Sequence, residues 1–401
     1  MRKKLLIIGV LFTMIILLSG CSSAGGYYRS GKKNFVSGNY EAAADYFTKA
    51  ITKNPNRADY YIDYGMALIS LERYDEAIEQ FDRVYMDKDV LMVRENNKRA
   101  LRGKGIVAYC MQSYQEAISQ FDAALAINAL SDLDVDILYY KGNALIKTGA
   151  YEEARDSYTR IIERNNKEAE ALSMRAYTYL KAGEFDKSLA DYEEAIRLKP
   201  NHYEYHFGKY ELMLEKKDEA GAAAVLSQAA AIEAVSKEDR YHQARIRYYQ
   251  GDYETALAEL SEGFAQGFPE AHFYIGEIYA KQKDYATAIY YYEKYIEKDD
   301  VTESSVYNQV AYCYMKQGDH SKALRFLEKG ISMGDAVTMK ALKRNEIIAL
   351  EYLGQFDTAQ EKLSSYLSAY PEDQEAAREV KFLNSRRIDH SNRAEEEDSG
   401  A

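Results

Sequence analysis

The stretch that decides the fold is Lys181-Ala-Gly-Glu-Phe-Asp-Lys-Ser-Leu-Ala-Asp-Tyr-Glu-Glu-Ala-Ile-Arg-Leu-Lys-Pro200. Ser188, Tyr192 and Ala195 recur at the i, i+4 and i+7 spacing that places small and aromatic side chains on one face of an α-helix. A Gly stands in the turn before this helix, and a Pro follows its end. The pattern therefore predicts a helix that packs closely against another helix.

The same pattern recurs along most of the chain. Residues equivalent to Ser188 mostly stand about 34 residues apart, and an aromatic residue or Leu follows each of them by four. In five of the ten copies a Gly lies twelve residues earlier, where two helices would cross closely. The aligned small residues are Ala43, Ala77, Ala117, Ala154, Ser188, Ala222, Ala256, Ala288, Ala323 and Ala359.

This repeat resembles the tetratricopeptide repeat, whose period is about 34 residues. The resemblance covers residues 27–373 and implies an all-α fold, a right-handed superhelical α-solenoid of about ten helix-turn-helix repeats. The sixth copy, around Glu219–Val225, is the least regular. Longer spacings between copies predict widened loops at residues 86–97 and 129–134.

The C-terminal residues depart from the repeat. Residues 374–385 are predicted to form a capping helix in which Ala377, Val380 and Phe382 partly cover the open end of the array. Residues 386–401 are polar and end in an acidic run, so we expect a solvated, disordered tail.

The N-terminal residues indicate export. Three basic residues are followed by an apolar run from Leu5 to Leu18, which is shorter than the ~20 residues of a membrane-spanning helix. Leu18-Ser19-Gly20-Cys21 ends this run and resembles the lipobox of bacterial lipoproteins. The resemblance implies that residues 1–20 are a cleaved signal peptide and that Cys21 carries covalent lipid, such as palmitate. The alternative is an ordinary signal peptide that happens to end in Cys.

On this interpretation residues 21–26 are a lipidated Cys with a short spacer, and the protein is anchored to a membrane on the extracytoplasmic side of a bacterial cell envelope. Two further cysteines, Cys110 and Cys313, lie on different repeats, so we expect no disulfide between them and a buried position for both.

Composition and motifs argue against several classes of function. The formal net charge of −12 disfavours nucleic acid as a partner. The chain has none of the phosphate-loop, zinc-protease or serine-hydrolase motifs, and the repeats leave no room for a catalytic domain, so we expect no enzyme. His202 and His206 have helical metal-ligand spacing but lack a third ligand, so we expect no metal and no cofactor besides the lipid.

Proteins with this repeat usually bind polypeptide segments on the concave face, which the first helix of each repeat lines. Aromatic side chains with Asn and Arg among them suit a polypeptide partner. For each tyrosine, the alternative is a role in packing adjacent helices. The predicted groove residues are Tyr139, Asn143, Tyr177, Phe207, Tyr241, Arg245, Tyr248, Phe273 and Tyr312.

Two functions follow from this reasoning. The favoured one is a lipid-anchored scaffold that binds a polypeptide partner in the groove, for assembly of an envelope complex. The alternative is a lipoprotein that captures a solute or glycan. The chain lacks Trp, the residue most used for sugar stacking, and also lacks large inserted loops.

We expect the Cys21→Ala variant to leave the membrane fraction, because it removes the thiol that would carry the lipid. Fractionation of cells into membrane and soluble protein measures this. Unchanged partitioning would show that Cys21 carries no anchor.

Overall fold

The structure is a computed structural model that describes residues 23–265, 267–297, 301 and 303–398, and of residues 387–398 it describes the backbone alone. The predicted signal peptide, residues 1–20, and the predicted lipid site at Cys21 lie outside the described residues. The chain forms two compact units that divide after Ala144. Throughout the described ranges the regular elements are helices, twenty-one α-helices and one 3-10 helix, and no strand occurs.

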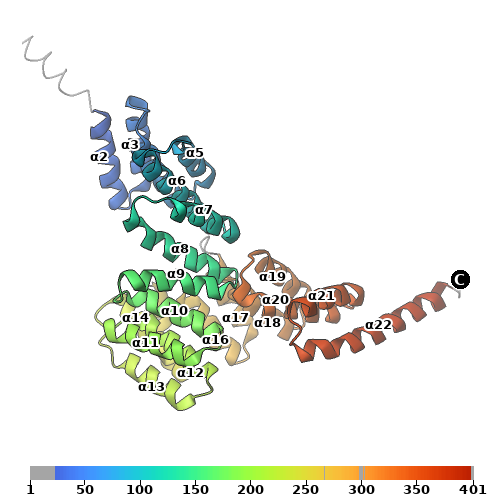
Figure 1. Ribbon diagram of the computed structural model, residues 1–401. Coiled ribbons are helices and arrows are strands. Elements are labelled where there is room, and N and C mark those ends of the chain that lie inside the picture. Colours follow the sequence, from blue (N-terminus) through green and yellow to red (C-terminus); the bar gives the residue numbers. More distant parts are fainter. Residues whose placement is uncertain (1–22, 266, 298–300, 302, 399–401) are drawn as a thin grey trace, which may run out of the picture. The chain divides into compact units, whose positions relative to one another are not determined.

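The α-helices follow one another as first and second helices of ten repeats, and Figure 1 shows them coloured along the chain. The first three pairs are α2 (Ala24–Val36) with α3 (Tyr40–Lys53), α4 (Ala58–Ser70) with α5 (Tyr74–Val84), and α6 (Leu91–Cys110) with α7 (Tyr114–Ala126). The next four are α8 (Asp134–Lys147) with α9 (Tyr151–Arg164), α10 (Ala169–Lys181) with α11 (Phe185–Leu198), α12 (Tyr203–Glu215) with α13 (Glu219–Ala230), and α14 (Lys237–Gln250) with α15 (Tyr253–Ala265). The last three are α16 (Ala271–Lys281) with α17 (Tyr285–Ile296), α18 (Ser305–Lys316) with α19 (His320–Ser332), and α20 (Ala336–Tyr352) with α21 (Phe356–Ala369). The final helix is α22 (Gln374–Asp398). The predicted all-α fold of ten helix-turn-helix repeats is confirmed.

The aligned positions of the sequence pattern form the core. All ten small residues aligned with Ser188 are buried, and so are all ten aromatic or Leu residues that follow them by four. The sixth copy obeys the same rule, since Ala222 and Leu226 are 3% and 4% exposed. Ser188 is tolerated where other copies have Ala because its hydroxyl donates a hydrogen bond to the Ala176 carbonyl at 2.8 Å.

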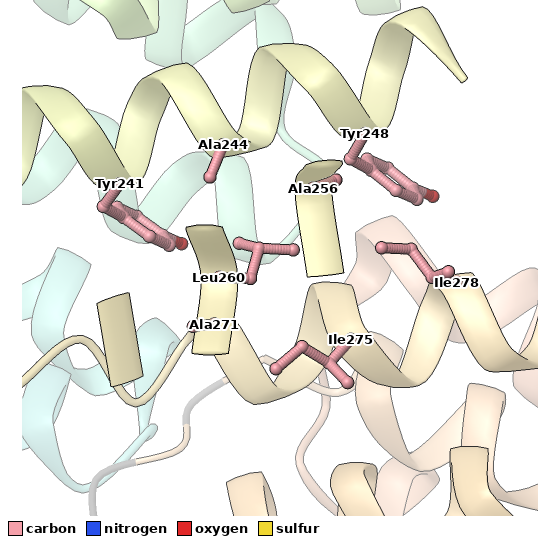
Figure 2. Close-up of a cluster of buried hydrophobic side chains, with 8 residues drawn as sticks. All are labelled: Tyr241, Ala244, Tyr248, Ala256, Leu260, Ala271, Ile275 and Ile278. Atoms are coloured by element: carbon pink, nitrogen blue, oxygen red, sulfur yellow. The ribbon is translucent and has the colours of Figure 1, made fainter. Parts of the chain in front are cut away.

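Figure 2 shows one of these cores, between α14, α15 and α16. Tyr241 and Tyr248 project from α14 on either side of Leu260 of α15. Ile275 and Ile278 of α16 close the core from the opposite side. Each repeat thus buries its apolar face against the first helix of the next one, as a single repeat could not do alone.

Glycine lets the two helices of a repeat approach closely. A Cβ built on Gly276 of α16 would lie 2.7 Å from ring atoms of Tyr292 on α17. The Tyr292 hydroxyl donates to Glu277 at 2.6 Å, which fixes the ring in this place. The same approach of a glycine to a ring occurs at Gly31, Gly65 and Gly105.

The first predicted loop is wrong in part, because α6 begins at Leu91 and residues 91–97 are helical. This segment contains neither Gly nor Pro, so the helix extends toward its N-terminus. The side chain of Asn97 accepts from the backbone N–H of Met86 at 3.0 Å and donates to its carbonyl at 2.7 Å. These two bonds hold the shortened loop against α6.

The second predicted loop, residues 129–134, contains the 3-10 helix η1 (Ser131–Leu133) and is organised by a buried lysine. Lys98 is 1% exposed. Its ammonium donates to the carbonyls of Ile127 and Ala129 at 3.1 and 2.7 Å and pairs with Asp134 at 2.5 Å. The three acceptors compensate the loss of water around a buried charge.

Both ends of the array differ from the predictions. Helix α2 begins at Ala24, inside the predicted spacer 21–26, because the Ser23 hydroxyl caps it by accepting from the Gly26 N–H at 3.1 Å. Helix α22 runs to Asp398, past residue 386, where the solvated, disordered tail was predicted to begin. The reason is composition, since no Gly or Pro interrupts this segment before Gly400 and it is rich in Arg, Glu and Ala.

The capping helix also uses a different face from the one predicted. Ala376 and Leu383 are fully buried and Val380 packs against them, whereas Ala377 and Phe382 are exposed. An ion pair between Arg344 of α20 and Glu379 adds to this contact.

Of the two cysteines, Cys313 is buried as predicted, but Cys110, the last residue of α6, is exposed. No helix in the described ranges combines the length and the apolar character needed to cross a membrane.

We expect Gly276→Ala to destabilise the protein by about 1–3 kcal/mol, because the added methyl group would overlap a ring that Glu277 holds in place. Gly263→Ala is the matched control, since its Cβ would meet Tyr241 at an ordinary 3.6 Å. That change should be neutral or stabilising, as Ala favours helix over Gly. Chemical denaturation measures both, and equal effects would contradict the prediction.

Candidate functional site

Two cavities lie on the first-helix side of the second unit. The larger, of about 630 Å³, is lined mainly by α10, α12 and α14. The smaller, of about 250 Å³, is lined by α14 and α16 and by residues near the start of α18. Arg245 of α14 contributes to the walls of both. The two cavities therefore meet at one side chain.

Aromatic rings form much of the wall of each cavity. In the larger one, the ring of Tyr249 lies 5.5 Å from that of Phe207 and 5.1 Å from that of Tyr210, between centroids. In the smaller one, Phe273 and Tyr274 meet edge to face at 5.4 Å. Such contacts hold the rings in fixed orientations, so the walls are preformed.

Arg245 is held in place by rings and by one carboxylate. Its guanidinium lies 4.1 Å from the ring centroid of Phe207 and 5.3 Å from that of Tyr274. It forms an ion pair with Glu204. It also donates to Nδ1 of His242 at 3.2 Å, which requires a neutral imidazole. Burial, and then the charge of Arg245, lower the pKa of His242 and favour this neutral form.

Five of the nine predicted groove residues come together here. Tyr177, Phe207 and Arg245 line the larger cavity, and Tyr241, Phe273 and again Arg245 line the smaller one. Burial raises the pKa of the Tyr177 and Tyr241 hydroxyls, so both side chains stay uncharged near neutral pH.

The other four predicted residues lie elsewhere. Tyr248 is 9% exposed and packs in the core of Figure 2, and its hydroxyl donates to Glu277 at 3.3 Å. That position fits the alternative role of packing adjacent helices. Tyr312 is exposed on α18 and meets Tyr285 edge to face. Tyr139 and Asn143 are partly buried on α8 and belong to the first unit.

The sequence reasoning missed a set of carboxylates. Glu170 and Glu204 line the larger cavity, and Glu270 lines the smaller one. Glu170, Glu204 and Glu238 are the second residues of α10, α12 and α14, and Glu270 is the N-cap of α16. From Glu170 to Glu270 these four residues are spaced by 34, 34 and 32. This recurrence at the repeat period was the signal that could have found them.

The two histidines with metal-ligand spacing have other contacts. His206 is buried and its Nε2 donates to the Pro200 carbonyl at 2.8 Å. His202 stacks on the ring of Tyr205 at 4.0 Å. Within the described ranges no group of three or more His, Cys, Asp or Glu side chains is arranged to hold a metal ion.

Comparison with known proteins identifies the repeat. Family models described as tetratricopeptide repeat match residues 31–89, 95–169 and 241–301, residues 169–202, and residues 304–333, which together make more than half of the chain. The chain is a tetratricopeptide-repeat protein.

Curated relatives share parts of this array. The Hsp70-Hsp90 organizing protein 1 of Glycine max is 30% identical over 198 residues, which are 42% of this chain and 34% of that protein. The DnaJ homolog subfamily C member 3 homolog of Dictyostelium discoideum is 27% identical over 212 residues, which are 51% of this chain and 37% of that protein. This tetratricopeptide-repeat protein thus spans about a third of the length of these relatives.

Solved structures of tetratricopeptide-repeat proteins also align. YrrB, described as having an unusual peptide-binding site, is 24% identical with a TM-score of 0.39, over 47% of this chain and 93% of that one. A tetratricopeptide repeat protein from Parabacteroides merdae is 19% identical with a TM-score of 0.44, over 63% of this chain and 98% of that one.

The second unit of this tetratricopeptide-repeat protein also closes on itself. Lys147, the last residue of α8, lies 3.5 Å from a carboxylate oxygen of Asp335, which caps α20. A Cβ built on Gly149 would lie 3.2 Å from the Cβ of Ala336. Asp335 is 5% exposed and also accepts from the Ser304 hydroxyl at 3.1 Å. The turn after α8 in the fourth repeat therefore touches the start of the tenth.

We expect Lys147→Ala to loosen this closing contact, because it removes the cation beside a buried carboxylate. Hydrogen–deuterium exchange measured by mass spectrometry should become faster in the turn around Gly149 and at the start of α20. Lys362→Ala is the control. It removes an ion pair within the tenth repeat, in which Lys362 of α21 lies 2.8 Å from Glu346 of α20. Exchange around Gly149 that is unchanged by Lys147→Ala would contradict the prediction.

Proposed function

We propose that this tetratricopeptide-repeat protein binds a segment of a polypeptide partner in the two cavities that meet at Arg245. The observation that carries the proposal is the convergence of Tyr177, Phe207, Tyr241, Arg245 and Phe273, from four successive repeats, around these cavities. Fixed aromatic walls supply contact area at little cost in side-chain entropy.

The arrangement suits an extended chain in particular. Side chains of an extended polypeptide point alternately to opposite sides, so residues i and i+2 lie on the same side. Two cavities separated by one side chain can each take one such residue. The repeat family is typically a non-enzymatic scaffold, which agrees with a binding role.

We further propose that the protein works as a scaffold anchored to the extracytoplasmic face of a bacterial membrane, where it assembles an envelope complex. Support for the anchor comes from the sequence of residues 2–21, with its basic start, apolar run and terminal Leu-Ser-Gly-Cys. The curated relative from Glycine max is named an organizing protein, which agrees with the scaffold role in general terms.

We expect Tyr177→Ala to weaken partner binding by at least tenfold while leaving the helix content unchanged. The Tyr177 ring is partly exposed in the larger cavity, and Ala is a strong helix former. Tyr192→Asp should instead unfold its repeat locally, because Tyr192 is 2% exposed and a charge would be buried there. Circular dichroism distinguishes the two variants.

Partner binding is measured by photocrosslinking in intact cells. A photoreactive amino acid replaces Tyr210, in the wall of the larger cavity, or Tyr290, which is 55% exposed on the second helix α17. We expect one reproducible protein adduct from position 210 that Tyr177→Ala abolishes, and no such adduct from position 290. Saccharide binding by the purified protein without any protein adduct would favour the glycan-capture alternative and overturn the proposal.

A further inference from the structure

The walls of the two cavities carry an excess of negative charge. Five carboxylates line them, and Arg245 is the single Lys or Arg among the described residues of both walls. Arg245 is already paired with Glu204. His202, in the larger cavity, adds no compensating charge near neutral pH because burial lowers its pKa. The carboxylates are Glu170, Glu204, Glu211, Glu270 and Glu303.

Two of these carboxylates are open to a ligand. Glu211 pairs with Lys181 at 2.8 Å, and Glu303 accepts from the Tyr295 hydroxyl at 3.0 Å. Glu170 and Glu270 are exposed, and neither forms an ion pair with any residue that the structure describes. One of them stands in each cavity, so each cavity offers a carboxylate that a cation could reach.

The aromatic walls already accept cations within the protein. The guanidinium of Arg245 lies over Phe207 in the wall of the larger cavity, and the ammonium of Lys181 lies 4.9 Å from the ring centroid of Tyr177. The negative face of an aromatic ring attracts a cation, most strongly where water is excluded. Rings and carboxylates together form the surroundings that a Lys or Arg side chain of a partner would need.

An acidic residue at the start of a helix also has an ordinary role, since it interacts favourably with the helix dipole. That role applies to Glu170 and equally to Glu219 and Glu254, which lie in the first turns of the second helices α13 and α15. It does not account for the placement of unpaired carboxylates beside aromatic cavities. Substitutions of Glu170 and Glu270, compared with substitutions of Glu219 and Glu254, therefore separate an effect on the helix from an effect on binding.

We propose that the two cavities select a basic polypeptide segment, whose Lys or Arg side chains lie against the aromatic walls and reach Glu170 and Glu270. This inference rests on the proposed function and adds the charge of the partner. The formal net charge of −12 would also speed the encounter with such a segment.

The test uses the full chain purified in detergent and three fluorescent peptides of equal length with blocked ends, in which Gly alternates with Arg, with Gln or with Glu. We expect fluorescence anisotropy to show binding of the Arg peptide, at least tenfold weaker binding of the Gln peptide and no binding of the Glu peptide. Tighter binding of the Gln or Glu peptide than of the Arg peptide would overturn the inference.

The double variant Glu170→Gln/Glu270→Gln should lower the affinity for the Arg peptide at least tenfold. The matched control is Glu219→Gln/Glu254→Gln, which removes the same charge from the starts of two second helices. It should keep the affinity within about twofold. Equal losses in the two double variants would reveal general attraction to an acidic protein and overturn the inference.

The proposed function can survive a failure of this inference. If the photoreactive residue at position 210 still captures a polypeptide that Tyr177→Ala abolishes, but none of the three peptides binds, the partner is recognised by something other than basic charge. Absence of both the adduct and peptide binding would overturn the two proposals together.

Discussion

The structure depends on one packing constraint, the burial of a ring or Leu from the second helix of each repeat against neighbouring helices. Where Gly stands on the first helix, as in Gly276 against Tyr292, the helices approach so closely that no Cβ fits. The aligned positions of all ten repeats are buried in this way. Because the contact repeats with a fixed period, it sets the stacking of successive first helices and so creates the surface that carries the cavities.

This constraint explains how much the sequence could predict. The small residue and the bulky residue four positions later are determined only by packing in the core. Their recurrence therefore predicts the helix pairs and even the register of the irregular sixth copy. The ends of the array follow other rules. Capping by Ser23 and the uninterrupted helix-forming composition of α22 are local effects that a repeat pattern does not contain. Lys98, whose three acceptors lie about thirty residues away, depends on tertiary structure.

The candidate site was predictable in its location and less so in its chemistry. The expectation that the first helices line a groove did place Tyr177, Phe207, Tyr241, Arg245 and Phe273 at the cavities. Tyr248 instead packs in the core with residues of α15 and α16, because the side of α14 that faces the groove also borders the next repeat. The carboxylates were overlooked because acidic residues at helix starts have a common structural explanation. A binding role for these carboxylates can be inferred only once the structure shows the aromatic rings beside them.

The contact of Lys147 with Asp335 changes how the second unit unfolds. A repeat array whose members touch only their neighbours can fray from either end, and its stability is a sum of local terms. A contact between residues 188 positions apart makes the repeats between them interdependent, so that losing one loosens the closure for all. The contact also restricts the number of repeats between Lys147 and Asp335. Inserting or deleting a single repeat there would displace one partner by a whole helix pair. The closure therefore makes unfolding of this unit more cooperative and fixes the number of its repeats.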